Sequence, residues 1–162
     1  MKIKSSSQHS NTPPLHSALV PEIIARGVCV HRGHVLLCRN RKRSNVYLPG
    51  GHIEGEERAP DALHRELVEE LGRRCRIGKF LGMVQHAFDH KGRRIVEINF
   101  VFAFRLPRAS LQKPPVSMEE KIEFYWCPLD RLARAGLQPH ILRRSLPAWL
   151  RRGTAPRWAS TF

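Results

Sequence analysis

The feature that most constrains the fold is a short amphipathic helix predicted over residues 58–71. Leu63, Leu67 and Leu71 recur every four residues and form an apolar ridge, which predicts a helix packed against a core. A proline near the start is tolerated in a first helical turn, and Gly72 provides a C-terminal stop. The chain therefore needs an apolar layer for this ridge to cover.

The same region concentrates the negative charge of a basic protein. Residues 54–70 hold six glutamates and one aspartate, half of the 14 acidic residues in a chain with 28 Lys and Arg. Glu66, Glu69 and Glu70 stand at i, i+3 and i+4, so they share one face of the helix and repel one another. A divalent cation that takes carboxylate oxygens would remove that repulsion. The alternative is a solvated helix face with nearby arginines as counter-ions.

The rest of the chain is a series of short apolar and β-branched runs separated by turn residues. Arg32-Gly33 and Lys91-Gly92 predict hairpin turns, and a proline-rich loop spans residues 106–117. One helix between groups of mainly antiparallel strands favours an α/β (α+β) fold. Strands are predicted at residues 23–31, 34–39, 46–49, 80–88, 94–104 and 121–127, and further helices at residues 128–136 and 140–152.

Composition divides the chain into a disordered leader at residues 1–20, one domain at residues 21–150 and a basic tail at residues 151–162. The formal charge of +14 and the pI near 10.8 predict attraction to polyanions. The four cysteines include no C-x-x-C pair, which favours reduced, buried thiols over a disulfide or zinc framework. We find no apolar run typical of a signal peptide or membrane span, so we expect a cytoplasmic protein without membrane contact.

The acidic region fits a longer pattern that resembles the Nudix box, G-x5-E-x7-R-E-U-x-E-E-x-G-U, where U is a bulky aliphatic residue. Gly51, Glu57 and the run from Arg65 to Gly72 match every fixed position but the last, where Arg73 replaces the aliphatic residue. The order of predicted elements resembles that family over residues 22–150. The resemblance implies an α/β/α sandwich with a mixed, mainly antiparallel sheet.

The resemblance also implies roles for individual residues. Glu66, Glu69 and Glu70 would be ligands of Mg²⁺, with Mn²⁺ as an alternative, and the backbone carbonyl of Gly50 an additional ligand. Arg65 would pair with Glu57 and orient the helix. Gly50 and Gly51 would let the backbone turn tightly beside a phosphate that the metal holds.

The catalytic base is less well determined. Glu97 lies with Asn99 on one face of the predicted strand 94–104, which favours a cleft wall, but a solvent-facing strand surface is equally compatible. Glu120, beside Glu119 after the proline-rich loop, is a second candidate and could equally be a solvated loop residue. Glu69 itself is a third.

Several further residues have both a functional and an ordinary interpretation. Histidines at 52, 86 and 90 fall near the expected cleft, and aromatic residues at 47, 88 and 126 could stack on a nucleobase, although core or surface roles are more common. The arginine-rich stretch from Leu142 to Trp158 could bind RNA, but its apolar spacing favours a docked amphipathic helix. Nucleic acid is thus not the favoured partner, and a homodimer stays open.

These observations predict a Mg²⁺-dependent Nudix pyrophosphohydrolase that cleaves a diphosphate bond in a nucleoside diphosphate-linked substrate. Residues 88–91 contain neither the proline nor the tyrosine that mark some members of the family, which favours a (deoxy)nucleoside triphosphate giving monophosphate and pyrophosphate. ADP-ribose or a nucleotide sugar is an alternative substrate. A catalytically silent nucleotide- or RNA-sensing domain is the alternative from another class.

Overall fold

The computed structural model describes residues 20–43, 45–151 and 157–162. The leader predicted for residues 1–20 lies outside the described residues except for Val20. No helix in the described part of the chain is long and apolar enough to cross a membrane.

The described strands form two four-stranded sheets. In the first, the order is β1-β6-β5-β8, with β1 parallel to β6, β5 antiparallel to β6 and β8 parallel to β5. In the second, β3 pairs antiparallel with β2, β4 and β7. The bounds are β1 Glu22–Val28, β2 Val30–His31, β3 His34–Asn40, β4 Val46–Tyr47, β5 Arg76–His90, β6 Arg93–Arg105, β7 Ile122–Pro128 and β8 Arg157–Ser160.

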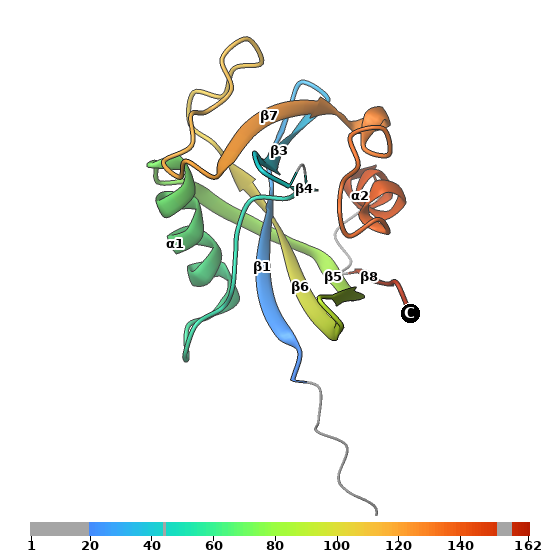
Figure 1. The fold of residues 1–162 in the computed structure, drawn as a ribbon. Helices are drawn as coiled ribbons and strands as arrows, with labels where there is room; N and C mark the ends of the chain where they lie inside the picture. The colour runs from blue at the N-terminus through green and yellow to red at the C-terminus, as the bar shows by residue number, and fades with distance from the viewer. Residues whose placement is uncertain (1–19, 44, 152–156) are drawn as a thin grey trace, which may run out of the picture.

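Two α-helices lie on opposite sides of these sheets (Figure 1). Helix α1 is Ala59–Leu71 and helix α2 is Leu142–Arg151. The predicted α+β fold with mixed, mainly antiparallel sheets is confirmed.

The prediction of a helix over residues 128–136 is wrong. This segment has only a three-residue 3-10 turn, η1 at Leu129–Arg131, followed by turns that end at Gly136 with φ +76°. Both Leu132 and Leu137 are fully buried, so the chain must bend to bring two apolar side chains into the core within six residues. So short a segment gains too little from helical hydrogen bonds to resist that bend.

The structure also adds a strand to residues 151–162, the range expected as a basic tail. Strand β8 pairs with β5 from Gly82↔Arg157 to Gln85↔Ser160. Gly82 permits this contact, because a Cβ there would lie 2.4 Å from the carbonyl oxygen of Arg157. The open edge of β5 supplies backbone partners that sequence periodicity cannot reveal.

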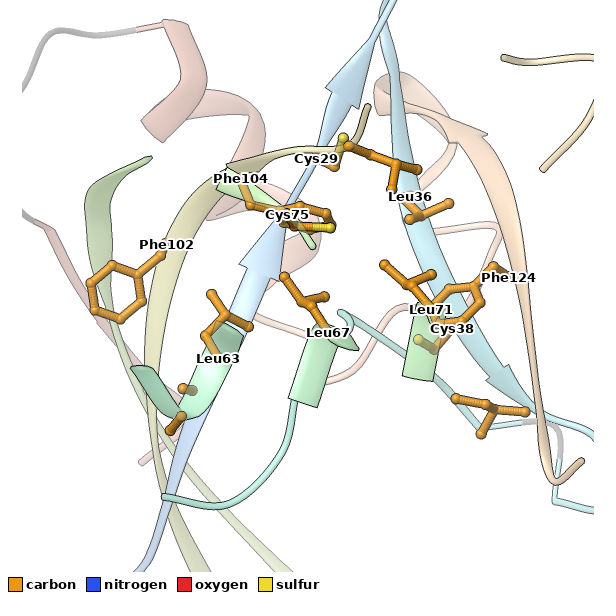
Figure 2. Packing of buried hydrophobic residues seen from close by; sticks show 14 residues of the cluster. Cys29, Leu36, Cys38, Leu63, Leu67, Leu71, Cys75, Phe102, Phe104 and Phe124 are labelled. Carbon is orange, nitrogen blue, oxygen red and sulfur yellow. The ribbon is translucent and has the colours of Figure 1, made fainter. Parts of the chain in front are cut away.

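The strands contribute side chains to two buried apolar clusters. One cluster contains the leucines of α1 and is called the α1 core; the other contains the buried residues of α2 and is called the α2 core. On β3, Leu36 and Cys38 pack toward the α1 core, whereas Val35 and Leu37 pack toward the α2 core. This alternation follows from the two-residue period of a strand whose two faces are both covered. Figure 2 shows the α1 core, where the leucine ridge of the helix meets aromatic, aliphatic and cysteine side chains of the strands.

The four cysteines are free and buried, as predicted, at positions 29, 38, 75 and 127. Three of them, Cys29, Cys38 and Cys75, belong to the α1 core. Burial raises the pKa of all four thiols above its ordinary value, so each is protonated at neutral pH and packs as a small apolar side chain.

The packing predicts how much one leucine of the ridge contributes to stability. Leu67 is fully buried, whereas its neighbour Val68 is 36% exposed. Leu67→Ala should lower the free energy of unfolding by about 2–5 kcal/mol, because it removes buried methyl groups and leaves a cavity. Val68→Ala is the matched control and should change it by about 0.5 kcal/mol or less. Urea denaturation measures both, and equal losses would contradict this packing.

Candidate active site

Helix α1 positions the glutamates of the box along one edge of the α1 core. Pro60 lies in its first turn, and Gly72 ends it in the left-handed conformation with φ +62°. The leucine ridge is buried, so the helix cannot rotate about its axis without exposing apolar surface. Glu66 and Glu70 are thereby placed against the Gly50-Gly51 loop, while Glu69 on the same helix is exposed.

The Gly50-Gly51 loop is held between β1 and α1. Backbone hydrogen bonds of 2.9 Å from Ala25 N–H to the Gly51 carbonyl and of 2.8 Å from Gly27 N–H to the Pro49 carbonyl attach it to β1. Gly50 has φ +114°, and a Cβ there would lie 2.2 Å from the carbonyl oxygen of Ala25. A Cβ on Gly51 would lie 2.5 Å from the Glu66 carboxyl group. Gly50 therefore requires glycine, whereas a Cβ on Gly51 would displace the flexible end of the Glu66 side chain, so the loop backbone lies directly against the helix.

Glu70 is the buried carboxylate of the site, with only 5% of its surface exposed. Its Oε2 accepts a 3.1 Å hydrogen bond from the backbone N–H of Gly50. Burial raises the pKa of Glu70 to about 8, although the Gly50 hydrogen bond and the charge of Arg26 oppose that shift. The charges of Glu119 and Glu66 raise it further. The site thus contains a carboxyl group that would ionise more readily beside a cation.

Arg65 joins the other acidic residues of the box in one ion-pair network. Its guanidinium lies 2.7 Å from Glu57, 2.9 Å from Glu66 and 3.4 Å from Glu69, and it also donates a 3.0 Å hydrogen bond to the His52 carbonyl. The pairing expected between Arg65 and Glu57 is therefore present in the geometry. Hydrogen bonding to Glu57 raises the pKa of Arg65 further above its ordinary value.

Arg26 on β1 is a site residue that sequence reasoning missed. Its guanidinium donates hydrogen bonds to the carbonyls of Gly50 and Leu48 and to Asn99 Oδ1, and it lies 5.3 Å from the ring centroid of Tyr47. The Gly50 carbonyl, expected to be a metal ligand, therefore faces a cation in this structure. Because a carbonyl oxygen has two lone pairs, the Gly50 carbonyl can accept a hydrogen bond from Arg26 and also coordinate a metal ion.

The loop before β7 packs against the C-terminal end of α1. Met118 N–H donates a 2.8 Å hydrogen bond to the Glu70 carbonyl, and Ser117 Oγ donates one of 3.4 Å to the same oxygen. Both glutamates that follow are exposed; the charge of Glu119 raises the pKa of Glu70, and Glu120 lies at the turn into β7.

Glu97 lines a cavity of about 410 Å³ on the α2 side of the first sheet, and none of the α1 carboxylates is among the residues that line it. Asn99 Nδ2 donates a 3.2 Å hydrogen bond to Glu97, and Asn99 Oδ1 in turn accepts one from Arg26. Arg26 thus links the cavity to the Gly50 loop. The cavity is lined by Arg26, Asn45, Tyr47, Leu48, His86, Phe88, Glu97, Gln138, Pro139 and Leu142.

The candidate histidines and aromatic residues separate in space. Tyr47, His86 and Phe88 line the cavity, and the His86 and Phe88 rings stack at 5.2 Å. Trp126 instead packs 5.8 Å from His31, and His52 lies 3.2 Å from a carboxylate oxygen of Glu22. The remaining histidine, at position 90, is exposed at the end of β5.

The α1 carboxylates fit a divalent cation in donor type. Among the described residues no three His, Cys, Asp or Glu side chains already converge on one point. Arg65 holds Glu66 and Glu69, while Glu70 is held by Gly50. All of these donors are carboxylate or carbonyl oxygens, which hard divalent cations prefer.

Comparison with known proteins identifies the family. The family model described as NUDIX domain matches residues 21–149 of this chain. The chain belongs to the Nudix family. This match covers the box, the Gly50 loop, α1 and both sheets except β8. The family generally uses divalent metal ions, in agreement with the oxygen donors on α1.

Similar proteins share this fold. A MutT-like protein of Streptomyces ambofaciens is 30% identical over 82 residues, which are 51% of each chain, so the chain spans about half the length of that curated relative. The structure of a MutT protein from Methanosarcina mazei has a TM-score of 0.62 at 23% identity, covering 81% of this chain and 94% of that one. An ADP-ribose pyrophosphatase from Streptococcus suis has a TM-score of 0.56 at 17% identity, covering 87% and 98%.

The burial of Glu70 predicts a pH-dependent difference in stability between two metal-free proteins. Burial raises the pKa of Glu70 in the folded protein from an ordinary value of 4.5 to about 8. Between these two pH values the unfolded protein releases the Glu70 proton and the folded protein retains it, so the stability of the folded protein falls as the pH rises. Glu70→Gln keeps the neutral state at every pH. With EDTA present, the variant should be more stable than the parent by on the order of 3 kcal/mol at pH 8.5, and this advantage should shrink at pH 5.

Urea denaturation at the two pH values measures that difference. The exposed Glu56 provides the control, because Glu56→Gln should show no change in relative stability between pH 5 and pH 8.5. An advantage of Glu70→Gln that does not depend on pH would contradict the burial of this carboxyl group.

Proposed function

We propose that this chain is a Mg²⁺-dependent Nudix pyrophosphohydrolase that cleaves a diphosphate bond in a nucleoside diphosphate-linked substrate. The observation that carries the proposal is the buried Glu70 carboxyl group, hydrogen-bonded to the Gly50 backbone with Glu66 packed on Gly51. A buried acidic group next to further carboxylates is costly unless a cation offsets the charge. Enzymes of this kind need such a cation beside a phosphate.

Glu66, Glu69 and Glu70 would hold the cation, with Mn²⁺ as a substitute, and the Gly50 carbonyl would add a backbone oxygen. A bound divalent cation would neutralise phosphate oxygens and lower the repulsion that an attacking water meets. Gly51 would keep the loop backbone close to Glu66, since any side chain at this position would meet that carboxyl group. These residues bind and orient the reacting groups.

Arg65 and Glu57 would act as positioning residues. The 2.7 Å ion pair between them anchors the guanidinium at the start of the helix. Once a cation takes Glu66 and Glu69, the guanidinium would keep Glu57 and the His52 carbonyl as partners. Arg65 can therefore release two carboxylates without losing its place.

Either Glu97 or Glu120 would serve as the base that takes a proton from the attacking water, with Glu69 as the third candidate. Glu97 is connected to the Gly50 loop through Asn99 and Arg26, which supports its assignment. For Glu120 the support is its position after the segment that packs on the Glu70 carbonyl. Glu119 belongs in the same comparison because its charge acts on Glu70.

The substrate we propose is a (deoxy)nucleoside triphosphate, cleaved to monophosphate and pyrophosphate. The cavity of about 410 Å³ supports it, because aromatic rings and a few polar groups line a volume typical of small-ligand sites. The formal charge of +14 would attract the triphosphate from solution. ADP-ribose and nucleotide sugars are the alternative substrates to be compared.

A substrate panel tests the proposed function directly. With Mg²⁺, the protein should hydrolyse nucleoside triphosphates faster than ADP-ribose or a nucleotide sugar, and Glu70→Gln should lower kcat/KM by about 100-fold or more because it removes a charged metal ligand. Glu56→Gln is exposed and should retain the parent activity. Uniform inactivity across the panel would favour a nucleotide-sensing domain. Full activity of Glu70→Gln would exclude Glu70 as a metal ligand.

Single substitutions can identify the base. Removal of the general base typically costs about 100- to 10,000-fold in rate and abolishes the acidic limb of the pH–rate profile. Among Glu97→Gln, Glu119→Gln and Glu120→Gln, we expect one variant to show both the large fall in rate and the loss of the acidic limb. The other two variants should keep the parental pH–rate profile. If all three kept it, the base would be assigned to Glu69.

A further inference from the structure

Residues that follow the matched family domain reach the cavity that contains Glu97. The family model ends at residue 149, whereas β8 pairs with β5 up to Gln85↔Ser160, and Thr161 continues that contact. Thr161 N–H donates a 3.1 Å hydrogen bond to the Gln85 carbonyl. The strand therefore ends beside His86, the next residue of β5, which lines the cavity.

The Thr161 hydroxyl has two partners on β5. It accepts a 3.2 Å hydrogen bond from Ala87 N–H and lies 3.0 Å from Nδ1 of His86. A hydroxyl has one proton to donate and two lone pairs. Since one lone pair already takes the Ala87 N–H, donation to Nδ1 uses the proton without requiring another acceptor. That arrangement leaves the imidazole hydrogen on Nε2.

His86 lines the cavity, so a hydrogen on its Nε2 is a possible donor to a bound ligand. Its ring stacks on Phe88 at 5.2 Å with 24° between the planes, and in the β5–β6 register it lies opposite Glu97. A donor nitrogen is thus available among the residues that line the cavity. An acceptor atom on the edge of a heterocycle would complement that donor, and nucleobases present such acceptors.

We propose that Thr161 is a positioning residue for substrate recognition, because it fixes His86 in the tautomer that donates from Nε2 to the base of the bound nucleotide. The proposal rests on the proposed function for the existence of that nucleotide. It assigns to β8 and Thr161 a role in specificity that the family domain, residues 21–149, does not contain.

The charge state of His86 agrees with this role. Burial lowers the pKa of His86, and His140 and Arg94 lower it as well, whereas Glu97 raises it. With burial as the largest influence, the imidazole is neutral at neutral pH, and only a neutral imidazole has a tautomer to select.

Nitrogen-15 NMR of the free, full-length protein tests the tautomer. The parent and Thr161→Ser should both show His86 with its hydrogen on Nε2, whereas Thr161→Val should shift toward a mixture of the two tautomers. Within the part of the chain that the structure describes, the neighbouring Ser160 hydroxyl accepts a hydrogen bond from Phe162 N–H of its own segment and has no bond to His86, so Ser160→Ala is the matched control and should leave the tautomer unchanged. A parent spectrum with the hydrogen on Nδ1 would overturn the proposal.

Steady-state kinetics test the consequence. For whichever of ATP, GTP, CTP and UTP is hydrolysed, Thr161→Val should raise KM about three- to tenfold with kcat within about twofold, the signature of a lost ground-state hydrogen bond. Thr161→Ser should restore the parental KM, and Ser160→Ala should not change it. An unchanged KM in Thr161→Val, or an equal rise in Ser160→Ala, would overturn the proposal.

Binding of nucleoside monophosphates separates this proposal from the proposed function. If no triphosphate is hydrolysed, AMP, GMP, CMP and UMP can be titrated while the His86 signals are followed. A monophosphate that perturbs His86 and binds about three- to tenfold more weakly to Thr161→Val would support the recognition role and leave hydrolysis as the part that failed. Monophosphates that do not perturb His86 would overturn the recognition role itself.

Discussion

The contact between the Gly50 backbone and the Glu70 carboxyl group is the constraint on which the rest of the site depends. The loop is confined because β1 lies on one side and α1 on the other: a Cβ on Gly50 would meet the Ala25 carbonyl, and the Gly51 backbone lies against the Glu66 carboxyl group. The Gly50 N–H group thereby points at a buried carboxylate on α1. Core packing thus sets the position of an acidic group within a strongly basic protein.

Two arginines organise the charge around this contact. Arg65 collects three carboxylates from the box, and Arg26 holds the loop carbonyl from the other side through β1. In a site with these partners, a divalent cation would compete with Arg65 for Glu66 and Glu69 but would find Glu70 without an arginine ion pair in the described structure. The buried glutamate is therefore the proposed ligand whose ionised form a cation would stabilise most.

Local features of the sequence predicted α1, most strands and the family, because helix periodicity, turn residues and box spacing all depend on near neighbours. The exceptions involve contacts between distant segments. Arg26 looks like an ordinary strand residue until β1 meets the Gly50 loop, and Glu119 gains its influence only when its loop packs on α1. Likewise, β8 exists because β5 offers a free edge. The metal-ligand and base assignments stay predictions.

The most direct test of the account is a crystal structure of the protein with Mn²⁺ and a non-hydrolysable nucleoside triphosphate analogue, with anomalous scattering used to locate the metal. The account predicts a peak bound by Glu66, Glu69 and Glu70 on α1, with carboxylate oxygens at about 2.0–2.2 Å and the analogue's phosphates completing the coordination. A metal bound elsewhere, with Glu66 still paired to Arg65 and Glu70 still held only by Gly50, would contradict it.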